Sequence, residues 1–353
     1  MFSSLGLVEV RVVVGNLKFL LISFLLLNAA GSVVSAQMVK PSESGTPQIK
    51  IHFLGEYSDK KQKLHKVYIA EETHSYLGHL GDDYIIKNLI DVSGKNYMLV
   101  DPGPDRKYAE SLLNHIHDEI KSKRRYPELI VDSAAKPESV LANASVSTRG
   151  TKILATPITQ DFMREHCPQC RIRLSDLLQD QSIKKSAIHL PNTQIKNGEE
   201  IPHYEQWVVF EFAARTGSDL VLWNETLGIA YVGGLVSYRT IPNLTDASML
   251  GWINALEFVK KLHPKIVIGA RGNEHGLNDL EDIDRTLSYF KAIKAMVSRD
   301  LEADGNAANA DVRLELTEFS DYFGYAKNHP LNVQHVWRDV EQEEMDINAS
   351  EKP

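Results

Sequence analysis

Apolar and polar positions alternate in short runs through the first part of the chain, which predicts a sheet there. The runs are rich in β-branched and aromatic residues, as strands are, and they lie at Lys50–Leu54, Lys66–Ala70, Tyr84–Val92, Asn96–Asp101 and Glu128–Asp132. Before the last run the period changes to that of a helix, because Asp105–Lys123 places Tyr108, Leu112 and Ile116 on one face. A second helix is predicted to open near Pro137, since proline suits the first helical turn.

The later part of the chain repeats this order of strands followed by helices. Strands are predicted at Gln206–Phe212, Asp219–Trp223, Ile229–Val232 and Lys265–Gly269, and a helix over Ala247–Leu262. The helices predicted at Asp279–Leu301 and Val312–Tyr322 have no strand after them, so we expect them to cover an outer face. Two such halves indicate one layered α/β domain, of the α+β kind, over residues 48–340.

Composition and charge narrow the range of functions. A chain of 353 residues with 43% hydrophobic and 24% charged residues can bury a sizeable core. The net charge of -8 argues against a nucleic-acid partner, which would need clustered Lys and Arg. The one dense basic run, Lys121–Arg125, ends a predicted helix and is interpreted as a solvated helix end. The sequence contains no motif of serine hydrolases, P-loop nucleotide hydrolases or dinucleotide-binding proteins.

The N-terminus has the pattern of a signal peptide. Arg11 and Lys18 precede the apolar run Phe19–Leu27, and Val34-Ser35-Ala36 supplies small residues for cleavage. We therefore expect a signal peptide over residues 1–36, a linker over 37–47, and an exported protein, periplasmic or secreted, with no stable membrane insertion after cleavage. The alternative is a retained membrane anchor, although the apolar run is short for a bilayer span. Residues 341–353 are predicted to form an acidic flexible tail.

The only two cysteines, Cys167 and Cys170, are spaced C-x-x-C. In an exported chain this spacing favours a local disulfide in a loop or at a helix start, and a redox-active pair is the alternative. No second pair exists to complete a four-cysteine zinc site.

Several segments carry a family resemblance in their order and spacing. The strand Tyr97–Val100 ends in Asp101-Pro102-Gly103, the strand Glu128–Asp132 leads into Pro137, and Arg215-Thr216-Gly217-Ser218-Asp219 runs into a later strand. These segments resemble the metallo-β-lactamase superfamily, and within it the exported branch named quinoprotein relay system zinc metallohydrolase. The resemblance implies a four-layer αββα sandwich, with two mixed sheets between layers of helices.

The same resemblance identifies the positions at which the family holds zinc. Its members use a His-x-His-x-Asp-His loop and later His and Asp residues, which together face two adjacent zinc ions. The aligned positions here are Ala134, Lys136, Glu138, Ser139, Arg215, Gly234 and Arg271. Only Glu138 keeps the chemistry of a metal ligand, because the others offer no donor atom, a weak hydroxyl or a cation. No zinc, other cofactor or catalytic residue is therefore predicted.

Three of the replaced ligands are cations, and we expect Lys136, Arg215 and Arg271 to converge with Glu138 and Asp219 in one pocket. Two interpretations remain open: an ion-pair network that holds loops in place, and a pocket in which Arg binds an anionic small molecule. The leading hypothesis for function is a non-catalytic binding or accessory protein, with an anionic small molecule or a periplasmic protein as partner. The resemblance implies a link to periplasmic quinoprotein oxidation systems. The alternative is a hydrolase with an altered or relocated metal site.

Overall fold

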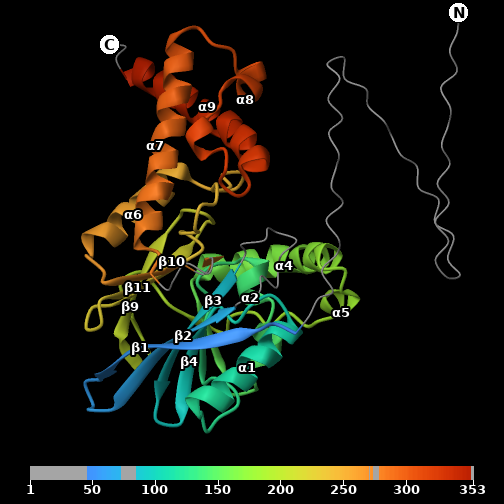
Figure 1. Ribbon diagram of the computed structural model, residues 1–353, viewed down its shortest axis with the longest axis vertical. Coiled ribbons are helices and arrows are strands. Elements are labelled where there is room, and N and C mark those ends of the chain that lie inside the picture. The colour runs from blue at the N-terminus through green and yellow to red at the C-terminus, as the bar shows by residue number, and fades with distance from the viewer. Residues whose placement is uncertain (1–45, 73–84, 270, 273–277, 351–353) are drawn as a thin grey trace, which may run out of the picture. The chain divides into compact units, whose positions relative to one another are not determined.

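Two mixed β-sheets face each other across an apolar layer to which both halves of the chain contribute (Figure 1). The computed structural model describes residues 46–72, 85–269, 271–272 and 278–350. Val67, Leu89 and Val100 project into this layer from the first sheet, and Trp207 and Leu222 project from the second. All five side chains are fully buried, so each sheet depends on the other for much of its apolar burial.

The first sheet is antiparallel at one side and parallel at the other. Its strands, in spatial order, are β1 (Ile49–Ser58), β2 (Leu64–Glu72), β3 (Ile85–Ser93), β4 (Asn96–Val100), β5 (Leu129–Val131), β6 (Lys152–Ala155) and β7 (Thr193–Gln194). Strands β1 to β4 pair antiparallel, and β4 to β7 pair parallel. The short strand β13 (Arg271–Gly272) pairs with the first residues of β3.

The second sheet combines an antiparallel meander with one parallel crossover. Its strands, in spatial order, are β12 (Ile266–Gly269), β11 (Ile229–Gly233), β10 (Asp219–Asn224), β9 (Tyr204–Phe212) and β8 (Glu200–Ile201). Strands β8 to β11 pair antiparallel, whereas β11 and β12 are parallel and are connected through a helix.

Helices cover the outer face of each sheet. Those on the first sheet are α1 (Arg106–Ile120), α2 (Pro137–Val140), α3 (Asn143–Val146), α4 (Pro157–Leu177) and α5 (Gln181–Lys184). Those on the second sheet are α6 (Met249–Lys261) and α7 (Leu280–Glu302). Helix α9 (Tyr325–Ser350) packs against α7 and against α8 (Ala310–Arg313). Two 3₁₀ turns, Ala307–Asn309 and Thr317–Phe319, connect the last helices. The order helix, sheet, sheet, helix confirms the predicted α/β sandwich.

Local chemistry explains where the main helices begin. Asp105 caps α1 by accepting a hydrogen bond from the Tyr108 N–H, and Thr156 and Ser248 cap α4 and α6 in the same way. Lys121 ends α1 in the left-handed conformation, with φ of 59°.

The helices of the last third differ from the prediction. The predicted helix Val312–Tyr322 is wrong: the segment contains the end of α8 and a 3₁₀ turn, and a longer helix, α9, starts at Tyr325. Val312 is 77% exposed, so its apolar character does not mark a buried face. The buried face of α9 includes the polar residues His329 and Asn332, which obscure its apolar period in the sequence. Helix α9 also continues past Glu341 into the acidic segment, as far as Ser350.

Helix α4 was not predicted, because the segment around its cysteines was expected to form a loop or the start of a helix. It contains Pro168 in its interior, where proline removes a backbone hydrogen bond and usually ends a helix. The expected signal peptide, and the expected linker as far as position 45, lie outside the described residues. Among the residues that are described, none of the helices is both long enough and apolar enough to cross a bilayer.

Candidate functional site

The predicted site residues gather at one edge of the sandwich. Strands β4, β5 and β11 end at this edge, and β10 begins there because it runs antiparallel to β11. The N–H of Leu220 in β10 donates a hydrogen bond to the carbonyl of Ser133 after β5, at 2.8 Å. The edge therefore joins the two sheets as well as the two halves of the sequence.

Asp101 anchors the loop that follows β5. The N–H and Oγ of Ser133 donate to its two carboxylate oxygens at 2.8 and 2.5 Å, and Tyr231 Oη donates at 2.8 Å. Asp101 has φ of 53°, a left-handed conformation that residues other than glycine seldom adopt. Burial raises the pKa of Asp101 to about 6, against the opposing effects of the Ser133 and Tyr231 hydrogen bonds and the Arg215 charge.

A glycine two residues later fixes the position of α2. The N–H of Gly103 donates to the Ser139 carbonyl, and the Gly103 carbonyl accepts from the Ala142 N–H, both at 3.0 Å. Gly103 has φ of 109°, and a β-carbon there would lie 2.3 Å from the ring of Tyr108. The site requires glycine at this point, and α2 is thereby held with Glu138 in its first turn.

Arg215 is the buried cation at the centre of the site, with 6% of its surface exposed. Its Nη1 lies 3.8 Å from Oε1 of Glu138, and its Nε lies 3.6 Å from Oδ1 of Asp219. These separations make ion pairs rather than hydrogen bonds, and Nε and Oδ1 have no hydrogen-bond partner among the described atoms. The other carboxylate oxygen of Asp219 accepts from the N–H and Oγ1 of Thr216, at 2.6 and 3.0 Å.

The guanidinium group of Arg215 fills the space in front of Gly234. A β-carbon built on Gly234 would lie 1.8 Å from Nη1 and 2.1 Å from Cζ of Arg215. Any longer residue at position 234 would therefore compete with Arg215 for the same volume. Arg215 and Gly234 are therefore complementary in volume, because the large side chain of one occupies the space that the absence of a side chain at the other leaves open.

Comparisons with known proteins bear on the fold. No protein-family profile matches the sequence, and no curated protein is similar to it. Solved structures do match: a metallo-β-lactamase from Pontibacter korlensis has a TM-score of 0.50 at 16% identity, over 69% of this chain and 99% of that chain. The metallo-β-lactamase DIM-1 exposed to ceftazidime has a TM-score of 0.51 at 14% identity, over 70% and 99%. The mono-zinc form of FIM-1 from Pseudomonas aeruginosa has a TM-score of 0.50 at 13% identity, over 70% and 98%.

This chain has the metallo-β-lactamase fold. At these identities the likeness concerns the fold alone. Within the described ranges, no group of three or more His, Cys, Asp or Glu residues is placed to hold a metal ion. At the positions predicted from the family resemblance, the space in front of Gly234 holds a cation and Ala134 brings no donor atom, so these residues do not fit zinc.

The structure brings most of the predicted positions together. Glu138, Arg215, Asp219 and Gly234 meet at the centre, and Ala134 and Ser139 are buried in the segment that follows β5. Lys136 is the residue before α2. In β13, the backbone of Arg271 pairs with Ile86 of β3. The side chain of Arg271 lies outside the described part of the structure.

The two cysteines lie in the interior of α4, and both are free, so the expected disulfide in a loop or helix start is not found. On a helix, residues three apart have β-carbons about 5–6 Å apart, beyond the roughly 3.8 Å of a disulfide. Burial raises the pKa of Cys170, with Arg173 and Lys136 opposing and Glu138 adding to the effect. Cys170 thus lies near the segment of Lys136 and Glu138, whose helix α2 contacts α4.

The sequence did not predict the buried hydrogen bonds that Asp132 and Asp101 accept beside the site. Asn143 donates from Nδ2 to Oδ2 of the fully buried Asp132, at 2.8 Å, and burial raises the pKa of Asp132 well above its ordinary value. Tyr231 lies in an apolar strand, so the sequence gives no indication of its hydrogen bond to Asp101. Such contacts join residues distant in the sequence, and no local pattern announces them.

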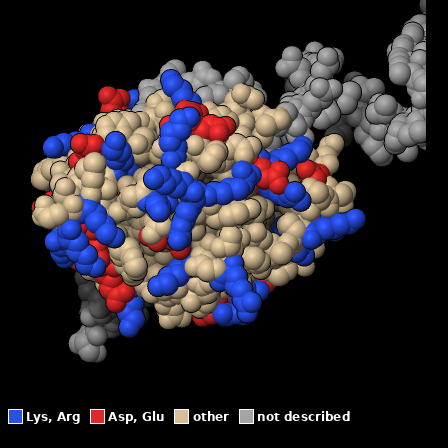
Figure 2. Space-filling model, turned by 90° about the horizontal axis from the view of Figure 1, so that it is seen from below, with Lys and Arg blue, Asp and Glu red and all other residues tan. Residues whose placement is uncertain are grey.

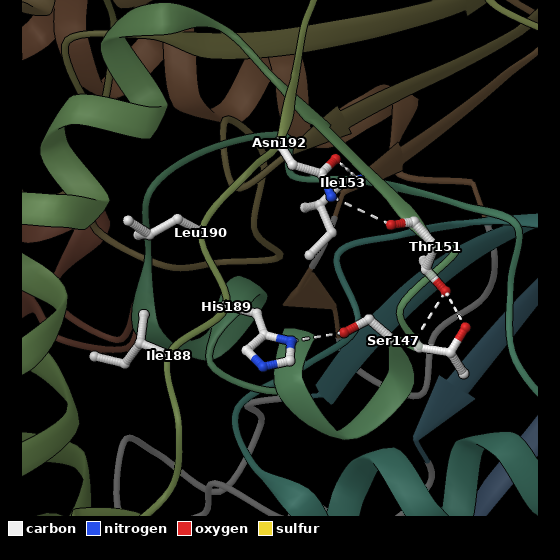
Figure 3. A pocket seen from close by; sticks show the side chains of 8 residues that line it. Ser147, Thr151, Ile153, Ile188, His189, Leu190 and Asn192 are labelled. Atoms are coloured by element: carbon white, nitrogen blue, oxygen red, sulfur yellow. Dashed lines mark hydrogen bonds between the residues drawn. The ribbon is translucent and has the colours of Figure 1, made fainter.

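A separate pocket of about 340 Å³ opens beside α3 and the start of β6 (Figure 3). In it, Oγ of Ser147 and Nδ1 of His189 are 2.9 Å apart. None of the residues that line it is Asp or Glu, and none belongs to the predicted site. The Ser147–His189 pair has no carboxylate in the pocket to orient it as a catalytic dyad.

Proposed function

We propose that this protein is an exported, non-catalytic binding or accessory protein that uses the metallo-β-lactamase fold without its zinc centre. The observation that carries the proposal is the Arg215 guanidinium in front of Gly234. A fixed cation at that place repels a metal ion and occupies the volume that a bridging ligand would need.

The electrostatics of the site favour an ion-pair network over an open anion pocket. Arg215 is nearly buried and has the carboxylates of Glu138 and Asp219 on two sides. A third carboxylate, Asp101, is close enough for its pKa to be lowered by Arg215. An anionic ligand would have to displace these carboxylates, so we propose a protein partner before an anionic small molecule.

Elemental analysis of the purified protein, equilibrated with excess zinc and then dialysed, tests the proposal. We expect no stoichiometric zinc and no hydrolysis of β-lactams or thioesters. One or two retained zinc ions per chain, with hydrolysis that depends on them, would establish the alternative of a hydrolase with a relocated metal site.

A double-mutant cycle tests the exchange between Arg215 and Gly234 directly. Gly234→Ala should destabilise the natural chain, because its β-carbon overlaps the guanidinium. The same substitution in an Arg215→Ala chain should cost less, and we expect a coupling energy of roughly 1–3 kcal/mol. Additive effects would show that the guanidinium does not occupy this space in solution.

The resemblance to the quinoprotein relay branch supports a further part of this proposal, a role beside periplasmic oxidation systems that use pyrroloquinoline quinone. Export is tested by the N-terminal residue of the mature protein, which we expect near Gln37. A full-length chain in the cell interior would contradict it.

A further inference from the structure

Basic side chains gather at the edge of the sandwich opposite the candidate site. Strand pairing places several loops at that edge: the β1–β2 turn, because Ser58 pairs with Leu64, and the β3–β4 turn, because Ser93 pairs with Asn96. The segments leading into β5 and β6 lie there too, since these strands run parallel to β4. We call the following exposed residues of these loops the basic edge: Lys60, Lys61, Lys63, Lys95, Lys121, Lys123, Arg124, Arg125, Arg149 and Lys152.

Among the described residues, the cations of the basic edge outnumber the carboxylates near them, which include Glu200 and Glu205 beside Lys60. Figure 2 shows Lys and Arg side chains predominating over acidic ones on this side of the molecule. Lys60 pairs with Glu200 at 2.8 Å, and Asp118 and Glu119 are exposed near the end of α1. Asp59 is buried in its turn, where it accepts hydrogen bonds from the Lys61 and Lys63 N–H groups. In a chain with a net charge of -8, this concentration of cations marks a surface for a polyanion.

The chemistry of the edge favours a lipid surface over a nucleic acid. Leu64 stands beside Lys63 at the same turn and is 48% exposed, as an apolar side chain is when it enters a headgroup layer. Binding of single-stranded nucleic acid relies on exposed aromatic rings for stacking. The aromatic residues of these loops, Tyr57 and Tyr126, are buried or half-buried. We propose that the basic edge docks this protein on a membrane surface of anionic phospholipid.

Vesicle co-sedimentation of the full chain tests the proposal. We expect binding to phosphatidylglycerol vesicles that is lost at high salt, and little binding to phosphatidylcholine vesicles. The test variant carries Lys121→Glu, Lys123→Glu and Arg124→Glu. Removing each cation that contacts an anionic surface should weaken binding about fivefold, so the triple variant should lose on the order of a hundredfold.

A matched control carries the same change of net charge elsewhere. Lys291→Glu, Arg299→Glu and Arg338→Glu alter exposed cations on α7 and α9, and binding should be nearly unchanged. Leu64→Ser should weaken the binding that remains at intermediate salt, and unfolding curves show whether each variant is folded.

Equal losses in the two triple variants would overturn the proposal. Binding to both lipids that does not change with salt would show that the apolar run Phe19–Leu27, rather than the basic edge, binds the vesicles. Tight binding of an RNA oligonucleotide without vesicle binding would identify a different partner.

Discussion

At the scale of single residues, the site sets one buried cation, Arg215, against two carboxylates. A buried carboxylate is unfavourable unless a cation lies beside it, and Arg215 supplies that cation to Glu138 and Asp219. Arg215 therefore offsets part of the cost of burying these carboxylates. The guanidinium is also planar and carries several donors, which suits a site with acceptors on different sides.

Removing this cation should cost substantial stability. We expect Arg215→Met to lower the free energy of unfolding by about 3–5 kcal/mol, because the buried carboxylate of Asp219 and the half-buried carboxylate of Glu138 would each lose an ion pair. Urea denaturation measures the change. Arg106→Met, which breaks the exposed ion pair with Glu110, is the control and should have little effect. Adding Glu138→Gln to Arg215→Met should recover part of the loss, and a loss no larger than that of the control would show that the ion pairs are unimportant.

A second buried charge gives the protein a pH-dependent stability. His65 is fully buried between the sheets, where its Nδ1 lies 2.8 Å from Oδ1 of Asp91 and its Nε2 lies 3.6 Å from Oδ2 of Asp59. Tyr57 stacks on the ring and donates to Asp91, and Tyr204 packs edge-on. Burial acts to lower the pKa of His65, but the hydrogen bond and charge of Asp91, together with Asp59, outweigh it and raise the pKa.

Because the folded pKa lies above the unfolded value of about 6.5, protonated His65 stabilises the folded state. This contribution is complete below about pH 6.5 and is lost as the pH rises through the folded pKa. We expect the free energy of unfolding, measured in urea, to fall as the pH rises above about 6.5. His65→Gln should flatten this part of the profile. An unchanged slope in the His65 variant would assign it instead to the buried carboxyl groups whose pKa is raised, Asp101, Asp132 and Asp279.

At the scale of secondary-structure elements, α4 sets the chemistry of the cysteines. Its helical geometry holds the two sulfurs apart, and it buries Cys167 more deeply than Cys170. Burial also raises the pKa of Cys167 to about 12. A thiol reacts as its thiolate, so the two cysteines should differ in reactivity although they share one helix.

We expect a maleimide at pH near 8 to modify Cys170 well before Cys167 in the folded protein. In urea without reductant both should react, because neither is in a disulfide. Mass spectrometry of peptides after each step measures the order. Faster labelling of Cys167, or failure of both to react in urea, would contradict the structure of α4.

The strands and the helices differed in how well the sequence predicted them. Strands such as β4 and β10 have apolar runs bounded by Gly, Pro or Asp, and their positions are confirmed. Helix α4 was not predicted because Pro168 lies inside it. Helix α9 was not predicted because its buried face includes Asn332, which donates hydrogen bonds to Pro242 and Tyr289. The gathering of Glu138, Arg215 and Asp219 followed from the family resemblance. The contact between Arg215 and Gly234 could not, since it depends on side-chain volume in the folded chain.

At the scale of the whole molecule, the two halves of the sequence share one core. The apolar layer between the sheets takes side chains from both halves. Trp207 Nε1, from the second half, donates to Oδ2 of Asp91 in the first half at 2.8 Å. Neither sheet could bury its inner face alone, so a division near Gly198 into two independently stable domains would expose the apolar layer to water.

The chain carries a natural probe in each half that tests this coupling. Both cysteines precede Gly198, whereas the four tryptophans, Trp207, Trp223, Trp252 and Trp337, all follow it. We expect urea unfolding followed by tryptophan fluorescence to have the same midpoint as the exposure of Cys167 to a short pulse of maleimide. Coincident transitions are the signature of a single cooperative unit. Trp207→Phe, which removes the hydrogen bond to Asp91, should move both midpoints together to lower urea. If labelling of Cys167 began at a urea concentration at which fluorescence was still native, the halves would unfold separately and the shared core would not bind them into one domain.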